Sequence, residues 1–224
     1  MSTIDSQELI RQIEHAVRTL GTSRDIACIG GCSVFATLGM DVRWSDTTRP
    51  LGDLLATGIR AALPTRADTV PLEVHYDIAP GSRVELRIAL TDVDAPPCAL
   101  LKMLNPSDSI AEWVAQTAPV WHRGGAGQML GLGVGGNPES AMLMARTALL
   151  DIGGQVEAHA YDPGDWRATL HEAVLAGCTA AGYPVQALRI VGAPTHAGTK
   201  PIALMSGGPA ATAYARVELE VTHA

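Results

Sequence analysis

The order of apolar and polar residues along the chain predicts a series of helices and strands. Apolar side chains recur at helical spacing from Leu9 to Leu20, and again over residues 51–63, where Leu54, Leu55 and Ile59 share one face. Residues 26–44 mix small and branched side chains and are expected to be extended. Later helices are expected from Ser107 or Asp108 through Val114, over residues 138–153 and over residues 165–181.

The clearest strand pattern lies over residues 72–90. Apolar residues alternate with polar ones in both halves of this stretch, at Leu72, Val74, Tyr76 and Ile78 and then at Val84, Leu86, Ile88 and Leu90. Pro80-Gly81-Ser82 supplies turn residues between the halves. We therefore predict an antiparallel hairpin with one buried face and with His75 on its polar face. Further strands are expected over residues 129–134, 186–191, 202–205 and 213–221.

Together these elements predict a mixed α+β fold of the α/β type. We expect a single domain in which helices pack on a mixed, partly antiparallel sheet. Residues 1–25 form an N-terminal helical segment in this interpretation, and residues 26–224 form the domain itself. The sequence shows no internal repeat and no long linker.

Composition and charge narrow the classes of function. Hydrophobic residues make up 47% of the 224 residues and charged residues 17%, which excludes intrinsic disorder for most of the chain. The net charge of −7 argues against a nucleic-acid partner, because phosphate-binding faces need clustered positive charge. The apolar runs are too short to cross a bilayer and no leader-like segment opens the chain. We therefore expect a cytoplasmic protein with no membrane partner.

The four cysteines are too few for a disulfide framework in a chain of this length. Cys28 and Cys32 form a Cys-x3-Cys pair with no second pair nearby, so two small buried residues are a better interpretation than a metal site. Cys98 and Cys178 are interpreted as core or near-surface residues.

A glycine-rich motif, Gly131-Leu-Gly-Val-Gly-Gly136, follows a predicted strand and opens a helix capped by Asn137. Its spacing matches a dinucleotide fingerprint, but the antiparallel pattern upstream and the lack of an acidic residue at the expected offset argue against that function. Two interpretations remain: a tight strand-to-helix turn, or an anion site that uses the N–H groups of the helix start. Gly136 and Asn137 are therefore candidate substrate-binding residues.

His196 lies in a loop bounded by Pro194 and Gly198, between two predicted strands. Loops carry function more often than core faces do, and imidazole is the usual acid/base group. The alternative is an ordinary loop histidine. The sequence contains no Gly-x-Ser-x-Gly elbow and no His-Glu-x-x-His motif, which argues against a serine hydrolase or a zinc protease.

Several of these segments, taken in order, resemble the α subunit, or N-terminal catalytic domain, of class I fumarases and L-tartrate dehydratases. The resemblance rests on residues 58–60, 74–81, 101–108, 131–150 and 193–196, and it extends from about Ile26 to the C-terminus. It implies the fold of that α domain and a hydro-lyase activity on small carboxylates. The helical region before the first matching segment is shorter here than in the family.

Family members hold a [4Fe–4S] cluster through three cysteines, and one iron acts as a Lewis acid on the substrate hydroxyl. The corresponding positions in this chain are Ile26 or Cys28, then Gly125, then Gly207 or Gly208. Glycine has no thiolate to give an iron. The resemblance therefore leaves Cys28 as the one remnant of a ligand set, and we expect no metal site and no cofactor.

The resemblance also implies substrate-site residues and partners. Arg60 corresponds to an arginine that contacts the substrate carboxylate in the family, and His196 to a histidine beside the substrate. Lys102 lies in the family's Lys-Met-Leu segment, and we take it with His196 as a candidate catalytic residue. The family's second domain has no counterpart in this sequence, so we expect a β-type subunit or a homo- or hetero-oligomer.

Three functional hypotheses follow. The first is a cluster-free hydro-lyase-like enzyme that acts on a small carboxylate by acid/base chemistry. The second is a non-catalytic or accessory subunit that pairs with a β-type chain. The third is a conventional [4Fe–4S] fumarate- or tartrate-type hydratase with displaced ligands, drawn from Cys28, Cys98 and Cys178.

Overall fold

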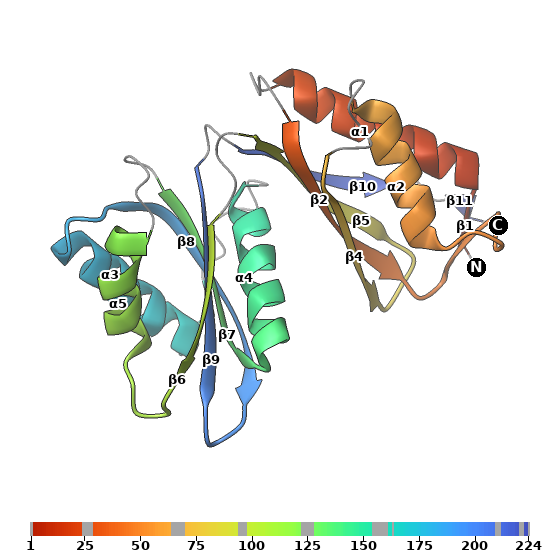
Figure 1. The fold of residues 1–224 in the computed structure, drawn as a ribbon. Helices are drawn as coiled ribbons and strands as arrows, with labels where there is room; N and C mark the ends of the chain where they lie inside the picture. The colour runs from red at the N-terminus through yellow and green to blue at the C-terminus, as the bar shows by residue number, and fades with distance from the viewer. Residues whose placement is uncertain are drawn as a thin grey trace. The chain divides into compact units, whose positions relative to one another are not determined.

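The computed structural model of the chain forms two compact units, drawn in Figure 1. Unit 1 contains Met1–Pro96 and Ala211–Ala224, and unit 2 contains Pro97–Ala210. The structure describes residues 2–23, 29–63, 70–93, 98–121, 128–153, 161–162, 164–208, 212–219 and 222–223. The boundary expected between residues 25 and 26 lies outside the described residues.

Unit 1 is built on a four-stranded sheet with the order β10-β5-β2-β4. Strand β2 pairs in parallel with β4 and antiparallel with β5, and β10 pairs antiparallel with β5. The bounds are β2 Ile29–Gly39, β4 Leu72–Ala79, β5 Val84–Asp92 and β10 Thr212–Leu219. A small second sheet joins β1 (Ser2–Ile4), β3 (Val42–Trp44) and β11 (Thr222–His223).

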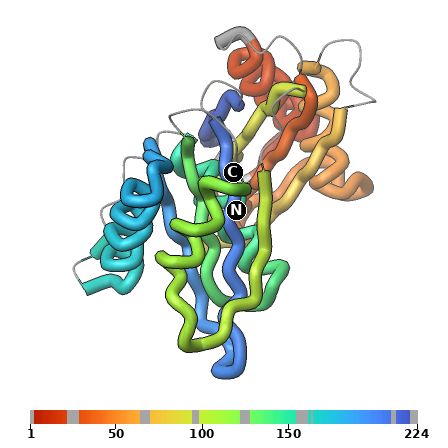
Figure 2. The backbone as a smooth tube through the Cα atoms, turned by 60° about the vertical axis from the view of Figure 1, so that its left-hand side comes forward, coloured from red at the N-terminus to blue at the C-terminus, as the bar shows by residue number. Residues whose placement is uncertain are grey.

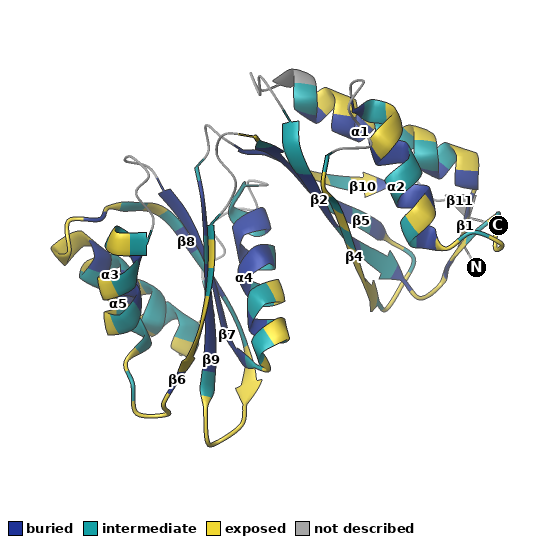
Figure 3. Cartoon of the chain, in the orientation of Figure 1, coloured by how far each residue is buried: buried dark blue, intermediate teal, exposed yellow. Residues whose placement is uncertain are grey.

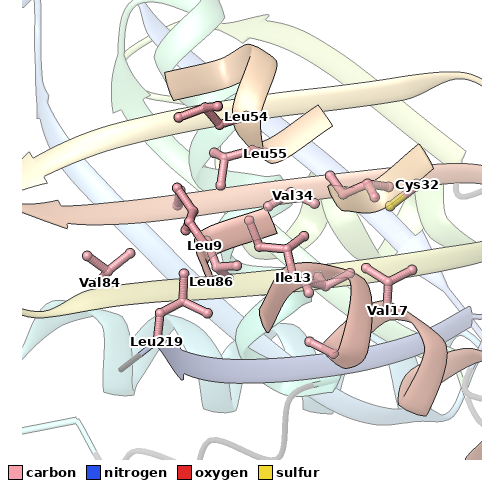
Figure 4. Close-up of a cluster of buried hydrophobic side chains, with 14 of the residues drawn as sticks. Leu9, Ile13, Val17, Cys32, Val34, Leu54, Leu55, Val84, Leu86 and Leu219 are labelled. Carbon is pink, nitrogen blue, oxygen red and sulfur yellow. The ribbon is translucent and has the colours of Figure 1, made fainter. Parts of the chain in front are cut away.

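Helices α1 (Ser6–Ser23) and α2 (Leu51–Ala62) pack side by side on one face of this sheet. The expected apolar stripes are buried: Leu9 and Ile13 of α1 and Leu54 of α2 have at most 1% of their surface exposed. Figure 4 shows these side chains meeting Val34 of β2 and Leu86 of β5. The apolar residues at helical spacing in α1 and α2 and the alternating apolar residues of the strands thus form one core.

The predicted hairpin over residues 72–90 is wrong. Both of its strands exist, but β2 lies between β4 and β5 and pairs with each of them. The turn at residues 80–83 therefore passes over the end of β2, where the N–H of Gly39 donates to the carbonyl oxygen of Arg83 at 2.7 Å. A Cβ atom at position 39 would lie 2.3 Å from the carbonyl oxygen of Gly81, so glycine is needed at this crossing.

Unit 2 is a four-stranded sheet with helices on both faces. Helix α4 packs on one face, and the pair α3 and α5 packs on the other (Figure 1). The strand order is β6-β9-β7-β8. The bounds are β6 Cys98–Leu104, α3 Ile110–Trp121, β7 Gln128–Gly136, α4 Pro138–Gly153, α5 Trp166–Ala180, β8 Val185–Thr195 and β9 Lys200–Gly207.

The two four-stranded sheets have the same topology. In each, a central strand pairs in parallel with one neighbour and antiparallel with another, which in turn pairs antiparallel with an edge strand. The position that β6 fills in unit 2 is filled in unit 1 by β10, which follows unit 2 in the chain. In the colouring of Figure 2, β10 is blue, whereas the other strands of its sheet run from red-orange to yellow. No internal repeat in the sequence predicted this shared topology.

The mixed α+β class and the partly antiparallel sheets are confirmed. The helix cap predicted at Asn137 is also present: its side chain accepts a hydrogen bond from the N–H of Ser140 at the start of α4. Among the described residues, no helix is both long and apolar enough to span a membrane.

Candidate functional site

Strand β7 and helix α4 meet with almost no space between their backbones. A Cβ atom at Gly131 would lie 2.2 Å from the carbonyl oxygen of Ala145, and one at Gly133 would lie 2.0 Å from that of Ala141. Strand β7 is buried up to its last residue (Figure 3). The first two glycines of the motif therefore serve helix–strand packing, which favours the tight-turn interpretation over a phosphate cradle.

The last two glycines of the motif make the turn into α4. Gly135 and Gly136 have φ angles of +88° and +66°, a region that glycine enters without steric cost. A Cβ atom at Gly135 would lie 2.0 Å from the carbonyl oxygen of Ala193, so this turn lies directly against β8. Gly136 is paired with Thr195, the last residue of β8.

Asn137 caps helix α4. Its Oδ1 accepts the N–H of Ser140 at 2.7 Å, and its carbonyl oxygen accepts the N–H of Ala141 at 2.9 Å. Pro138 has no N–H. Three of the first helical positions therefore offer no N–H to a ligand, and an anion here would depend on Glu139, whose side chain is itself acidic. These contacts describe a structural cap, and substrate binding by Gly136 or Asn137 stays a prediction.

The loop that carries His196 passes over the carboxyl end of β7. Strands β8 and β9 lie on opposite sides of β7, so the residues between them must cross its end. Gly136 adjoins Thr195 on one side, and Val134 is the last residue of β7 paired with β9 on the other. The fold thus brings His196, Gly136 and Asn137 to one edge of the sheet of unit 2.

The exposed ring of His196 is held by its own loop. Its Nδ1 accepts the N–H of Gly198 at 3.0 Å. A Cβ atom at Gly198 would lie 3.3 Å from the same Nδ1, a close fit that glycine avoids. The Thr195 hydroxyl donates to the carbonyl oxygen of Thr199 at 3.0 Å and closes the loop. Because Nδ1 is an acceptor, the neutral ring carries its proton on Nε2.

Lys200 was not singled out by the sequence analysis, yet it organises this edge. Its Nζ donates to the carbonyl oxygens of Pro106 at 3.1 Å and Asp108 at 2.6 Å. These contacts tie the start of β9 to the segment of residues 101–108. An ammonium has three N–H donors, and the contacts with described residues use two of them. A usable signal was present: Lys102 and Lys200 are the two lysines of the sequence.

The other two candidate residues lie on other elements, one on β6 and one on α2. Lys102 is an exposed residue of edge strand β6, where it pairs with Ile202 of β9. Arg60 is exposed near the end of α2, in unit 1. The structure therefore places His196, Lys102, Gly136 and Asn137 in unit 2 and Arg60 in unit 1. The roles of Arg60 and Lys102 stay predictions.

Two of the described cysteines, Cys32 and Cys178, are poorly suited to hold an iron–sulfur cluster. Cys32 is 2% exposed in the core of unit 1, and Cys178 is fully buried in the core of unit 2. Burial raises the pKa of the Cys178 thiol, which disfavours the thiolate that iron requires. Gly207 and Gly208 supply no donor, whereas Ile26, Cys28 and Gly125 lie outside the described residues. Across the described ranges, no three His, Cys, Asp or Glu side chains gather at a metal site.

A search of curated proteins gave no match. One solved structure, the crystal structure of cyanuric acid hydrolase from A. caulinodans, aligns at 12% identity and a TM-score of 0.26. That alignment covers 89% of this chain and 65% of the hydrolase, less than two thirds of its length.

A family model described as fumarate hydratase (Fumerase) matches residues 64–210. This range covers more than half of the chain: all of unit 2, together with β4 and β5 of unit 1. His196, Lys102, Gly136 and Asn137 lie inside the matched range, and Arg60 lies before it. The chain therefore belongs to the fumarate hydratase (Fumerase) family, a family of hydro-lyases.

Proposed function

We propose that this chain is a cluster-free hydro-lyase-like enzyme that acts on a small carboxylate by acid/base chemistry. The observation that carries the proposal is the placement of His196, whose ring is fixed by Gly198 at the carboxyl end of β7 and β8. Ligands of open α/β sheets commonly bind at the carboxyl ends of strands. The family match supports the reaction class, and the unsuitable donors at the described cluster positions support a reaction without iron.

His196 presents an N–H at Nε2 in this arrangement. A neutral imidazole that donates from Nε2 polarises a substrate oxygen without itself carrying charge. The best target is the hydroxyl that leaves during dehydration, or an oxygen of the adjacent carboxylate. In the reaction, a solvent base takes the proton from the carbon next to the carboxylate, and that electron pair forms the new C=C bond. The hydroxyl on the neighbouring carbon takes a proton from His196 or from solvent and leaves as water. A ring that gives up its Nε2 proton must first be protonated at Nδ1 as well, which requires that Nδ1 release the Gly198 N–H.

Lys200 is positioned to assist at the same edge. Two of its ammonium protons are held by the carbonyl oxygens of Pro106 and Asp108, which fixes the charge in place. The third proton is suited to a carboxylate oxygen of the substrate. Arg60 and Lys102 enter the proposal as a carboxylate contact and a catalytic group through the resemblance alone.

Without a Lewis acid, the substrate must be an activated one. General acid–base catalysis contributes about 10²–10⁴-fold, so a carboxylate with a more acidic C–H bond or a better leaving group than malate is expected. A panel of small hydroxy acids in D₂O tests this. Deuterium entry at the carbon next to the carboxylate, followed by NMR, reports proton removal even where no product accumulates.

Variants at position 196 separate the two roles of the histidine. His196→Gln keeps an N–H near the place of Nε2, whereas His196→Ala removes it. If His196 acts as a hydrogen-bond donor, H196A loses about 10²-fold or more in kcat/KM and H196Q retains a measurable part of the activity. If His196 transfers the proton, both variants lose activity equally. Wild-type activity in H196A would contradict the proposed site.

Iron analysis tests the cluster-free part of the proposal. Anaerobic reconstitution is expected to leave the purified chain colourless and without stoichiometric iron. About four irons per chain, with absorbance typical of a thiolate-bound cluster, would contradict it and favour the conventional hydratase. An inactive chain that gains activity with a β-type partner would favour the accessory subunit.

A further inference from the structure

Strand β4 of unit 1 has one free edge among the described residues, because its strand pairing is with β2 alone. The carbonyl oxygens of Pro71 and Ala79, at its two ends, accept N–H groups from Cys32 and Met40 on the β2 side. Successive residues of a strand point their backbone groups to opposite sides. The even-numbered residues of β4 therefore direct their N–H and C=O groups outward: Leu72, Val74, Tyr76 and Ile78.

This edge carries large exposed apolar side chains. Tyr76 is 61% exposed and Ile78 is 64% exposed. Both line a cavity of about 450 Å³ together with Met40, which is 60% exposed, and with Trp44 and Leu51. A free edge with exposed apolar residues is a template for pairing with another strand.

We propose that β4 pairs antiparallel with β4 of a second copy of this chain, about a two-fold axis at Tyr76. This proposal is independent of the proposed catalytic function. In this register Tyr76 faces its own counterpart, Val74 faces Ile78, and His75 faces Asp77. The outward-pointing residues then exchange their backbone hydrogen bonds, and the His75–Asp77 pairs fall at the positions where opposing side chains lie closest.

Charge complementarity selects this register. A two-fold axis at His75 would place Glu73 opposite Asp77, and an axis at Asp77 would place two aspartates opposite each other. An axis at Val74 also pairs His75 with an acid, but it sets Asp77 and Ile78 against residues 71 and 70, which lie before the start of β4. The axis at Tyr76 places His75 opposite Asp77 at two symmetric positions, and all of these residues belong to β4.

One local hydrogen bond would be exchanged on pairing. In the single chain, Asp77 Oδ1 accepts the N–H of Ile78 at 2.8 Å, so the carboxylate covers an outward N–H of the edge. In the paired state that N–H donates to the carbonyl oxygen of Val74 of the second copy. The Asp77 carboxylate is then released to the histidine opposite it. Tyr76 and Ile78 of each copy then lie beside the same face of the partner's strand, where they help to cover the cavity of each chain.

Sedimentation velocity of the full chain over a concentration series tests this pairing. We expect a monomer–dimer equilibrium for the wild type. Ile78→Lys and His75→Asp should each raise the dimer dissociation constant by about tenfold or more, because each places an unfavourable group at two symmetric positions. Leu101→Lys is the matched control: Leu101 is 38% exposed on edge strand β6 of unit 2, and its change should leave the equilibrium unaltered.

A double variant distinguishes loss of the charge pair from a local disturbance of β4 by a single substitution. H75D/D77K restores opposite charges across the proposed axis and should recover dimer formation that H75D loses. Circular dichroism of each variant checks that unit 1 remains folded. A wild type that stays monomeric at all concentrations, a dimer insensitive to I78K, or a double variant no better than H75D would overturn the proposal.

Discussion

Tyr183 is a polar residue in the core of unit 2. The side chain is 8% exposed, and its hydroxyl is buried with no hydrogen-bond partner among the described residues. Burial, with smaller effects of Cys178 and Cys98, raises the pKa of Tyr183 to about 12. The phenol is therefore kept neutral in the folded chain at a pH where an exposed tyrosine ionises.

We predict that this residue makes stability fall at high pH. The folded pKa lies above the unfolded value of about 10. Between about pH 10 and about pH 12 the tyrosine therefore ionises in the unfolded chain but not in the folded chain, which favours unfolding. The free energy of unfolding should fall by up to about 1.4 kcal/mol per pH unit in this window through Tyr183 alone.

Urea unfolding of wild type and Tyr183→Phe across this window measures the effect. Y183F should lack this part of the decline, and near neutral pH it should be close to wild type or more stable, because it removes an unpaired buried hydroxyl. Equal declines in both proteins would contradict the prediction.

Individual residues show how far the sequence could identify the candidate site. His196 stood out because its loop is bounded by proline and glycine, and the structure confirms its loop position. Lys200 did not stand out, because its importance comes from contacts with Pro106 and Asp108, more than 90 residues away in the chain. Local patterns identify residue types that can do chemistry, but long-range contacts decide which of them are held in place.

The contact of β7 with α4 depends on glycines, which have no side chain to separate the strand from the helix. Gly131 and Gly133 place the backbone of β7 against the backbone of the helix, and Ala141 and Ala145 form the helix side of the contact. Larger residues on either element would force the two apart. The glycine-rich motif is therefore read best as a packing surface followed by a turn.

We predict that Gly133→Ala is strongly destabilising. Its Cβ would lie 2.0 Å from the carbonyl oxygen of Ala141, so α4 or β7 must shift, at a cost of about 1–3 kcal/mol or more. Gly52→Ala in α2 is the matched control. A Cβ at Gly52 meets no atom within 4 Å, and this helical glycine should gain about 0.5–1 kcal/mol when replaced. Denaturant unfolding distinguishes them; a tolerated G133A would contradict this account of the motif.

At the scale of elements, the sequence predicted whether a segment is a helix or a strand better than it predicted which segments lie beside it. Alternating residues located β4 and β5, and the capping residue Asn137 located the start of α4. Alternation identifies which face of a strand is buried, but it contains no information on which strand lies beside it. The turn at residues 80–83 therefore suggested a hairpin, although Gly39 allows the chain to cross the end of β2 instead.

Across the whole molecule, β10 links the last part of the chain to the first. It pairs with β5 from Thr212–Thr91 to Leu219–Val84, and its Ala213 and Leu219 lie in the core of unit 1. Arg216 of β10 also forms an ion pair with Glu85 of β5. Unit 1 is thus assembled from segments that precede and follow unit 2 in the sequence.

Truncation should therefore damage the two units unequally. Removal of residues 212–224 should strip hydrogen-exchange protection from β5 and β2 in unit 1 and leave β7 of unit 2 protected, because the lost strand belongs to the unit 1 sheet. Removal of residues 222–224 alone is the control, since it affects the small sheet of β1, β3 and β11. Equal loss of protection in both units would contradict the division into two units.

The late position of β10 also constrains synthesis on the ribosome. Domains often fold in the order in which they emerge, the N-terminal one first. Here unit 2 is complete once residue 210 has emerged, whereas the outer edge of β5 has no partner until residues 212–219 follow. The nascent chain therefore completes unit 2 before unit 1, and one edge of β5 stays unpaired while all of unit 2 is synthesised.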